Sequence, residues 1–244
     1  MDSGVGQNAA GFLPDFDDVF TRIANRYDSL CDVFSLLAHR AWKSHIAKRI
    51  AETPGSLVLD AASGTGDIPW RISRQIMQKQ LPRKKLLVTD LCPAMLDMAR
   101  RKLDGMPDVE CQIADAHNLS QFETASVDVY SISFGMKIMQ RDLVLSEARR
   151  VLKPGGVFYC LEAARIPLEF VHRAYLRYMD LCLPLIARIA TSGDAGAYNY
   201  LLQGVHEFPR QDRFAAEIAA AGFENVGFEN LSLGIVALHW AVRR

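Results

Sequence analysis

Between residues 57 and 161, short apolar runs alternate with longer stretches in which apolar residues recur at helical spacing. A short apolar, partly β-branched run between turn residues is typical of a strand buried on both faces. Five such strands are expected, at residues 57–59, 85–90, 108–113, 127–132 and 157–161. The helix after the first carries an apolar row at Ile68, Ile72 and Ile76, and Pro93 begins the helix after the second. This alternation predicts an α/β fold, a parallel sheet with helices on both faces.

The two ends of the chain depart from the alternation. Residues 17–50 show a helical pattern ahead of the first strand, and residues 1–16 are expected to be a disordered lead. Residues 166–204 are expected to form a helical insertion that acts as a lid. A last strand pair begins near Gly222, and its short link favours an antiparallel hairpin.

These last strands, at about residues 223–231 and 233–242, complete a predicted sheet of seven strands. The sheet is expected to be mostly parallel and to end in the antiparallel hairpin. We predict a single domain over residues 17–244, with ligands bound at the carboxyl ends of the parallel strands.

The segment from Leu57 to Asp67 predicts a buried strand, a glycine turn and the start of a helix. Gly64 and Gly66 allow backbone angles that a Cβ atom would forbid, and they let a ligand approach the main chain. Asp67 stands where a helix N-cap is expected. Such a unit holds a nucleotide in many folds, but a dinucleotide site needs a third glycine, where this chain has Pro69.

An acid follows each of the first three strands: Asp60, Asp90 and Asp115. Asp60 either contacts the ligand or braces the loop. The two oxygens of Asp90 match the paired hydroxyls of ribose, and Asp115 can accept the adenine amino group while the Ala116 N–H faces the ring. Because neither a Walker lysine nor an arginine pair accompanies the loop, we expect a nucleoside without phosphates. S-adenosylmethionine (SAM) is the common one, and NAD is the second candidate.

Composition limits the remaining classes. Lys plus Arg equals Asp plus Glu, at 28 each, which argues against a dedicated nucleic-acid binder. Five cysteines without a CxxC pair and six scattered histidines predict reduced thiols, a cytoplasmic location and no metal site. No apolar run reaches membrane-spanning length. The apolar side chains Leu176, Met179, Leu181, Leu183, Leu185 and Ile186 suit a peripheral membrane contact, core packing or the face of a homodimer.

Four motifs occur in order along the chain: Asp60-x-x-x-Gly64-Thr65-Gly66, Asp90, Asp115-Ala116 and Leu152-Lys153-Pro154-Gly155-Gly156. In this order they resemble the class I SAM-dependent methyltransferases. Further stretches are similar to the ubiquinone/menaquinone-biosynthesis C-methyltransferases, the UbiE type, over almost the whole chain after residue 17. They are Phe20-x-x-Ile23-Ala24-x-x-Tyr27-Asp28, Ser35, His39-Arg40-x-Trp42-Lys43, Ile132-Ser133-Phe134-Gly135, Ala197-Tyr198-x-Tyr200-Leu201, Phe208-Pro209, Gly222-Phe223 and Gly234-Ile235-Val236-Ala237-Leu238-His239.

The resemblance implies a Rossmann-like class I fold, SAM as the cofactor, and methylation of a ring carbon of a prenylated benzoquinol or naphthoquinol. It implies SAM contacts at Thr65, Asp90, Asp115, Ala116 and Ser133. Asp60, Gly64 and Gly66 complete the cofactor site that the residues themselves predict.

The chain departs from the family pattern near the expected acceptor. The family usually continues Ser-Phe-Gly with Leu/Ile-Arg-Asn, whereas this chain has Met136-Lys137-Ile138, and Cys31 replaces a usual Asn. Lysine lacks the planar fork of arginine. A methyltransferase for another small phenolic or specialised-metabolite acceptor is therefore a second hypothesis. A SAM-binding protein without methyl transfer is a third.

The expected chemistry needs an activated ring. A quinol ring carbon becomes nucleophilic when an adjacent phenol, with a pKa of about 10, loses or shares its proton. Lys137 is expected to stabilise the phenolate. Tyr27 and Tyr198 are candidates to relay the proton, as are Asp67 and His39.

Overall fold

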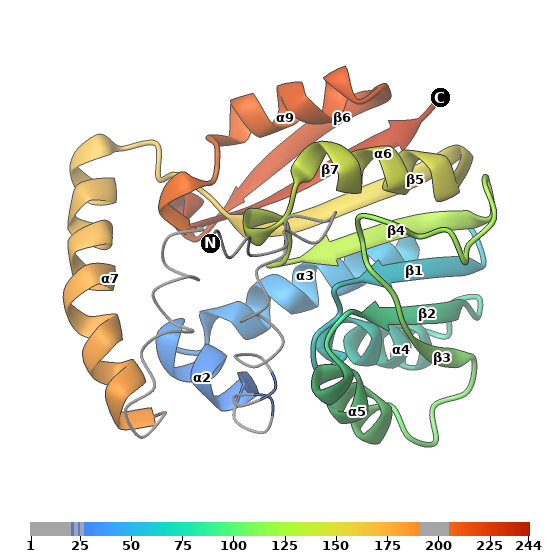
Figure 1. Cartoon of the computed structure of the whole chain (residues 1–244), viewed down its shortest axis with the longest axis horizontal. Helices are drawn as coiled ribbons and strands as arrows, with labels where there is room; N and C mark the ends of the chain where they lie inside the picture. Colours follow the sequence, from blue (N-terminus) through green and yellow to red (C-terminus); the bar gives the residue numbers. More distant parts are fainter. Residues whose placement is uncertain (1–20, 22–23, 25–26, 191–204) are drawn as a thin grey trace, which may run out of the picture.

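The computed structural model describes residues 21, 24, 27–190 and 205–244. They contain a seven-stranded sheet in the order β3-β2-β1-β4-β5-β7-β6 (Figure 1). Its strands are β1 (Leu57–Ala61), β2 (Lys85–Asp90), β3 (Val109–Ile113), β4 (Val127–Ser133), β5 (Leu152–Ala163), β6 (Phe223–Leu231) and β7 (Val236–Arg243). β1 to β5 pair in parallel, whereas β7 is antiparallel to both β5 and β6. The predicted mixed sheet with a final antiparallel hairpin is confirmed.

Helices cover both faces of the sheet, as the alternation predicts (Figure 1). Those with described bounds are α2 (Tyr27–Phe34), α3 (Ala38–Glu52), α4 (Asp67–Lys79), α5 (Pro93–Lys102), α6 (Arg141–Val151), α7 (Glu169–Ala190) and α9 (Gln211–Ala220), with short 3-10 turns η2 (Met136–Ile138) and η3 (Ser232–Gly234). α3, α4 and α5 pack with Val58 on one face, and α6 and α9 pack with Leu59 on the other. Neighbouring residues of a strand point to opposite faces, so the apolar strands supply two cores.

Two local predictions are wrong, one of a turn before a strand and one of a helix cap. Residues 153–156, expected as the turn that leads into the predicted strand 157–161, lie within β5. Leu152 pairs with Val127 and Val157 pairs with Val129, so the residues between them bulge out of the ladder. Asp67 is the first residue of α4 rather than its cap, because Gly66 occupies the N-cap with φ 75°.

The helical segment predicted at residues 17–50 is two helices where the structure describes it. α2 and α3 are separated by a turn in which Leu36 and Leu37 have φ of 48° and 67°. Only α7 represents the predicted insertion, since residues 191–204 lie outside the described residues, as do residues 1–16.

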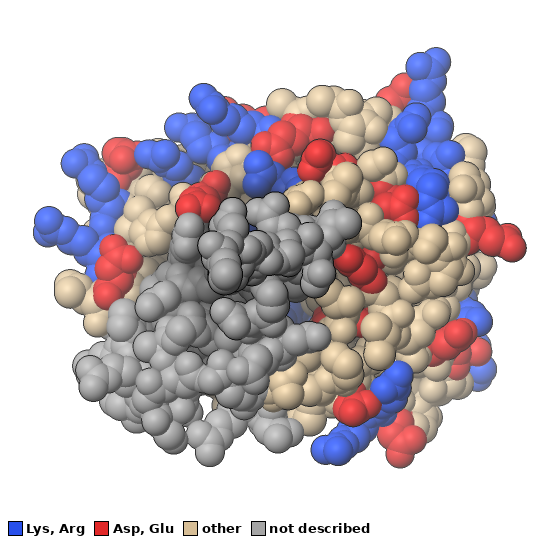
Figure 2. Space-filling view, in the orientation of Figure 1, with Lys and Arg blue, Asp and Glu red and all other residues tan. Residues whose placement is uncertain are grey.

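Charged side chains of both signs are interspersed over the described surface in Figure 2. Within the described ranges, no helix combines the length and apolar character needed to cross a membrane.

Candidate active site

The loop between β1 and α4 has the backbone that two glycines allow. Gly64 and Gly66 have φ of 57° and 75°, in the left-handed region that other residues disfavour. A Cβ atom at Gly66 would lie 2.9 Å from the Cβ of Ala99, so the loop packs directly on α5. Among the described residues, no atom lies within 4 Å of the Cβ position of Gly64. The main chain there is open to a ligand.

Asp90, at the end of β2, holds this loop. Its Oδ2 accepts a hydrogen bond from the Gly64 N–H at 2.7 Å, and its Oδ1 accepts one from the Cys92 N–H at 2.9 Å. These two hydrogen bonds orient the Asp90 carboxylate toward the loop. The acid predicted for the ribose hydroxyls therefore lies beside the glycine loop.

Asp60, near the end of β1, is only 2% exposed. Its Oδ1 accepts a hydrogen bond from Ser131 Oγ at 2.5 Å, and its Oδ2 accepts one from Ser63 Oγ at 2.6 Å. Burial raises the pKa of Asp60 to about 6, although both hydroxyls favour the ionised form. Asp60 thus ties β1 to β4 and to the glycine loop, which is the geometry of a brace.

Asp115 and Ala116 follow β3, and Ala116 is buried. The N–H and the Nδ1 of His117 both contact Asp115 Oδ1, at 2.9 and 2.7 Å. Burial opposes ionisation of Asp115, but the hydrogen bonds from His117 outweigh it and lower the pKa. The carboxylate is therefore ionised, and both contacts from His117 fall on its Oδ1.

Ser133 ends β4. Its Oγ is buried and has no hydrogen-bond partner among the residues that the structure describes. Since buried hydroxyls are normally paired, this atom is suited to a bound ligand.

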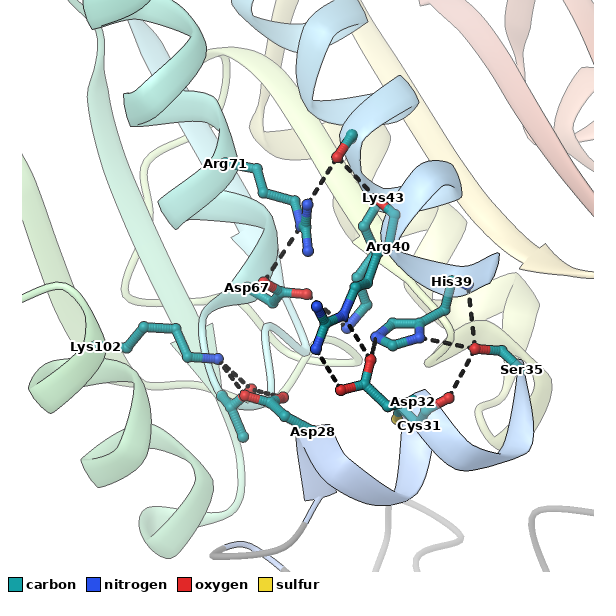
Figure 3. A network of polar contacts seen from close by, with 12 residues as sticks. Asp28, Cys31, Asp32, Ser35, His39, Arg40, Lys43, Asp67, Arg71 and Lys102 are labelled. Carbon is teal, nitrogen blue, oxygen red and sulfur yellow. Dashed lines mark hydrogen bonds and ion pairs between the residues drawn. The ribbon is translucent and has the colours of Figure 1, made fainter. Parts of the chain in front are cut away.

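The helix α2 closes over the glycine loop through a polar contact (Figure 3). Thr65 Oγ1 donates to Asp28 Oδ1 at 2.7 Å. The Lys102 ammonium lies 2.5 Å from Asp28 Oδ2 and 3.0 Å from Thr65 Oγ1. The threonine predicted to contact SAM is therefore buried in a triad that joins α2, the loop and α5.

Asp67 and His39 lie in the same network, on facing helices (Figure 3). Lys43 Nζ is 3.0 Å and Arg71 Nε 3.3 Å from the Asp67 carboxylate. Burial opposes ionisation of Asp67, but these two cations outweigh it and lower the pKa. Burial and Lys43 lower the pKa of His39 to about 4, so it is neutral at neutral pH. Both groups can accept a proton, and both are held by neighbours.

Lys137, on η2, forms a buried ion pair. Its ammonium contacts the Phe134 carbonyl oxygen and lies 3.1 Å from Glu162 Oε1. The Lys137 side chain is 7% exposed and that of Glu162 is 0% exposed. The Lys137 N–H also donates to Glu162 Oε2 at 3.2 Å. The predicted cation is thus fixed where β4 and β5 end.

Tyr27, on α2, is the described member of the two predicted tyrosines, and Tyr198 lies outside the described residues. The neighbouring Cys31 and burial raise the pKa of Tyr27 well above its usual value. Its hydroxyl therefore keeps its proton at neutral pH and is suited to donate a hydrogen bond.

Several polar residues of the site were not predicted from the sequence: Asp28, Lys43, Lys102, His117 and Glu162. Glu162 lies near the end of β5, the last parallel strand, so the same strand-end position that marked Asp90 marks it. Lys102 reaches Thr65 across 37 residues, which no local pattern indicates. Among the described residues, no group of three His, Cys, Asp or Glu side chains is suited to hold a metal ion.

Comparisons with known proteins give a consistent picture. The model of the ubiE/COQ5 methyltransferase family matches residues 13–243. The ubiquinone/menaquinone biosynthesis C-methyltransferase UbiE of Brucella anthropi is 39% identical over 229 residues, which cover 91% of this chain and 85% of that protein. The protein of the same name from Cereibacter sphaeroides is 40% identical over 225 residues, covering 91% and 87%.

Solved structures resemble the fold at low sequence identity. A SAM-dependent methyltransferase from Thermotoga maritima superposes with a TM-score of 0.63 at 17% identity, covering 93% of this chain and 99% of that one. An O-methyltransferase family protein from Burkholderia thailandensis gives 0.60 at 20% identity, covering 91% and 61%.

The strand order, the open glycine loop and the acids that end β2 and follow β3 define a class I SAM-dependent methyltransferase. The open Cβ position of Gly64 and the Ser133 hydroxyl, which no described residue pairs with, fit SAM as its cofactor. The chain belongs to the ubiE/COQ5 methyltransferase family.

Proposed function

We propose that this chain methylates a ring carbon of a prenylated benzoquinol or naphthoquinol. The names of the Brucella and Cereibacter relatives support this acceptor class. The observation that carries the proposal is the buried Lys137–Glu162 ion pair, because it holds a cation at the carboxyl ends of β4 and β5. A phenolate forms readily beside such a cation.

In this proposal the cofactor residues hold SAM in a fixed pose. Asp90 would accept hydrogen bonds from the ribose hydroxyls, Asp115 Oδ2 would accept one from the adenine amino group, and Ser133 would bind through its hydroxyl. Thr65 and the Ala116 N–H complete the contacts, and Asp60 braces the loop with Gly64 and Gly66. When bound, SAM supplies an electrophilic methyl carbon.

The acceptor residues activate the ring. Lys137 stabilises the oxyanion that forms as the phenol proton leaves, and Tyr27 donates a hydrogen bond to it. Tyr198 remains a candidate for the proton relay. Excluding water and aligning the ring carbon with the methyl group supply much of the rate.

The decisive assay supplies methyl-labelled SAM with demethyl naphthoquinols, demethyl benzoquinols and simple phenols. A product with a new ring-carbon methyl, located by mass analysis, is expected for the quinols. Methyl transfer to a phenol oxygen alone would refute carbon methylation. It would favour a methyltransferase for another small phenolic or specialised-metabolite acceptor. Lys137 and Ile138 suit that hypothesis because they replace the usual Arg-Asn pair. Binding of S-adenosylhomocysteine with no labelled product from any acceptor would support a SAM-binding protein without methyl transfer.

We also propose that the carboxyl edge of the sheet touches a membrane, where a prenylated acceptor is held. Exposed apolar side chains gather in segments that approach one another there: Leu36, Leu37, Leu168, Phe170 and Leu233. Trp42 Nε1 donates to Ser232 Oγ at 2.8 Å, which joins the start of α3 to the β6–β7 turn. The Cβ position of Gly234 is 2.8 Å from Pro167 Cδ, which joins this turn to the start of α7.

The test is sedimentation with phospholipid vesicles. Wild type is expected to pellet with them, and Leu233→Asp to remain in the supernatant with an unchanged melting temperature. Met77→Asp, an exposed apolar residue on α4, is the matched control. Equal pelleting of all three proteins contradicts the proposed surface. The cytoplasmic location and the homodimer stay predictions.

A further inference from the structure

His117 joins two parts of the site that the sequence treats separately. Its side chain is 3% exposed. Its Nδ1 lies 2.7 Å from Asp115 Oδ1, and its Nε2 accepts a hydrogen bond from the Gln140 N–H at 3.1 Å. Gln140 is the N-cap residue of α6 and stands just after η2, which carries Lys137.

The hydrogen bonds fix the tautomer of His117. Because the Gln140 N–H is a donor, Nε2 has to be the unprotonated nitrogen. Nδ1 therefore carries the hydrogen and donates it to Asp115. The ring thus donates from Nδ1 to Asp115 and accepts at Nε2 from Gln140, and the two nitrogens cannot exchange these roles.

The loop after β3 does not need His117 to stay on α6. Glu147 accepts the Leu119 N–H at 2.7 Å, and Arg150 donates to the carbonyl oxygens of Leu119 and Phe122 at 2.8 and 2.9 Å. These contacts anchor the loop further along α6. The specific effect of His117 is to connect Asp115 to Gln140.

We propose that His117 is a positioning residue that couples the adenine side of the SAM site to the acceptor side. On the Asp115 side its ring joins its own backbone N–H in occupying Oδ1, so that Oδ2 faces the adenine amino group. On the Gln140 side it fixes the start of α6 and hence the turn that holds Lys137. The inference rests on the proposed function, since it assigns adenine to Asp115 and the acceptor to Lys137.

Two substitutions separate the two bonds. His117→Asn keeps a short amide donor for Asp115 and loses the acceptor for Gln140. His117→Gln carries its amide oxygen far enough to accept from Gln140, and it loses the short donor to Asp115. His45→Asn, which removes a partly exposed histidine paired with Glu229, is the matched control.

Calorimetry with S-adenosylhomocysteine measures the adenine side, and the KM for a demethyl naphthoquinol measures the acceptor side. His117→Gln is expected to raise the Kd roughly 10-fold with little change in acceptor KM, because it loses one hydrogen bond to a charged group. His117→Asn is expected to raise the acceptor KM several-fold with little change in Kd. Equal effects of both variants on both quantities, or no effect, overturn the inference.

A measurement on the wild type covers the case in which a variant does not fold. S-adenosylhomocysteine is expected to slow amide hydrogen exchange of Gln140, although Gln140 is not assigned any contact with the ligand. Unchanged exchange at Gln140 with slowed exchange at Gly64 overturns the coupling. If the wild type binds S-adenosylhomocysteine but methylates no quinol, the proposed acceptor fails, while Kd and exchange still decide the role of His117.

Discussion

Replacing Lys137 by methionine keeps most of the side-chain volume and removes only the ammonium. The change leaves the Glu162 carboxylate, which is 0% exposed, without its cation. Two backbone donors remain on Glu162, the Ala163 N–H at 2.8 Å and the N–H of residue 137 at 3.2 Å. The variant therefore tests what the ion pair contributes to folding and what it contributes to catalysis.

The expected cost in folding follows from burial. Removing one partner of a buried ion pair costs about 3–5 kcal/mol, and the two backbone donors favour the lower end, about 3 kcal/mol. For a chain of this size, 1 kcal/mol lowers the melting temperature by about 2–4 °C, so a fall of roughly 6–12 °C is expected. The double variant Lys137→Met/Glu162→Gln has no buried charge and is expected to return to within about 1 kcal/mol of wild type.

Turnover is expected to behave differently from stability. Both the single and the double variant lack the cation proposed to stabilise the phenolate, so kcat with a quinol is expected to fall by about 100-fold or more in each. The Kd for S-adenosylhomocysteine, measured alongside, is expected to stay near the wild-type value. Lys79→Met removes the cation of an exposed pair with Glu52 and serves as the control, with no measurable change expected.

Two outcomes contradict this reasoning. Recovery of kcat in the double variant would show that Lys137 acts only through the fold. An unchanged melting temperature for Lys137→Met would show that the buried pair contributes little, and the acceptor side would then need another organising contact.

The remaining predictions concern the glycine loop and two buried titratable groups. Gly66→Ala is expected to lower the melting temperature and the calorimetric affinity for S-adenosylhomocysteine, because φ is 75° and the new Cβ would lie 2.9 Å from Ala99 Cβ. Gly105→Ala, at φ 72° with no described atom within 4 Å, is the control and is expected to show only the backbone strain, as a lower melting temperature with unchanged affinity. The pKa of Asp60 is raised to about 6, so the free energy of unfolding is expected to fall by about 3 kcal/mol as pH rises from about 4 to 6. Urea unfolding of Asp60→Asn is expected to lack this fall. Burial lowers the pKa of His239 to about 4, so stability is expected to fall as pH drops from about 6.5 to 4, and a His239→Gln variant that loses as much as wild type over that range would contradict the assignment.

Local pattern predicted the sheet well because its strands are apolar runs between turn residues. The bounds of β2 match the prediction at both ends, since Lys85 and Asp90 mark where burial stops. The helical period of residues 17–50 could not show the break between α2 and α3. Leu36 and Leu37 adopt positive φ there, and leucine gives no sign in the sequence of this conformation.

The proposed cofactor residues could be selected from the sequence because each stands at the end of a strand or in the glycine loop, where the sheet topology brings them together. The contacts that orient them could not be. Thr65 meets Lys102, and His117 meets Gln140, across 37 and 23 residues. Such pairs form only when helices pack on the sheet, so the sequence pattern does not predict them.

The position of β7 has a consequence for how the chain is made. β7 is formed by Val236–Arg243, yet it lies between β5 and β6. On the ribosome, β6 emerges before the strand that pairs it to the sheet exists. The β6 edge of the sheet, with α9 packed on it, therefore closes only after residues 236–243 have left the exit tunnel. The Trp42–Ser232 contact likewise waits for the segment around Ser232 to emerge. Deleting residues 236–243 would remove β7 and detach β6 with it, so the loss of this one strand acts on the interior of the sheet.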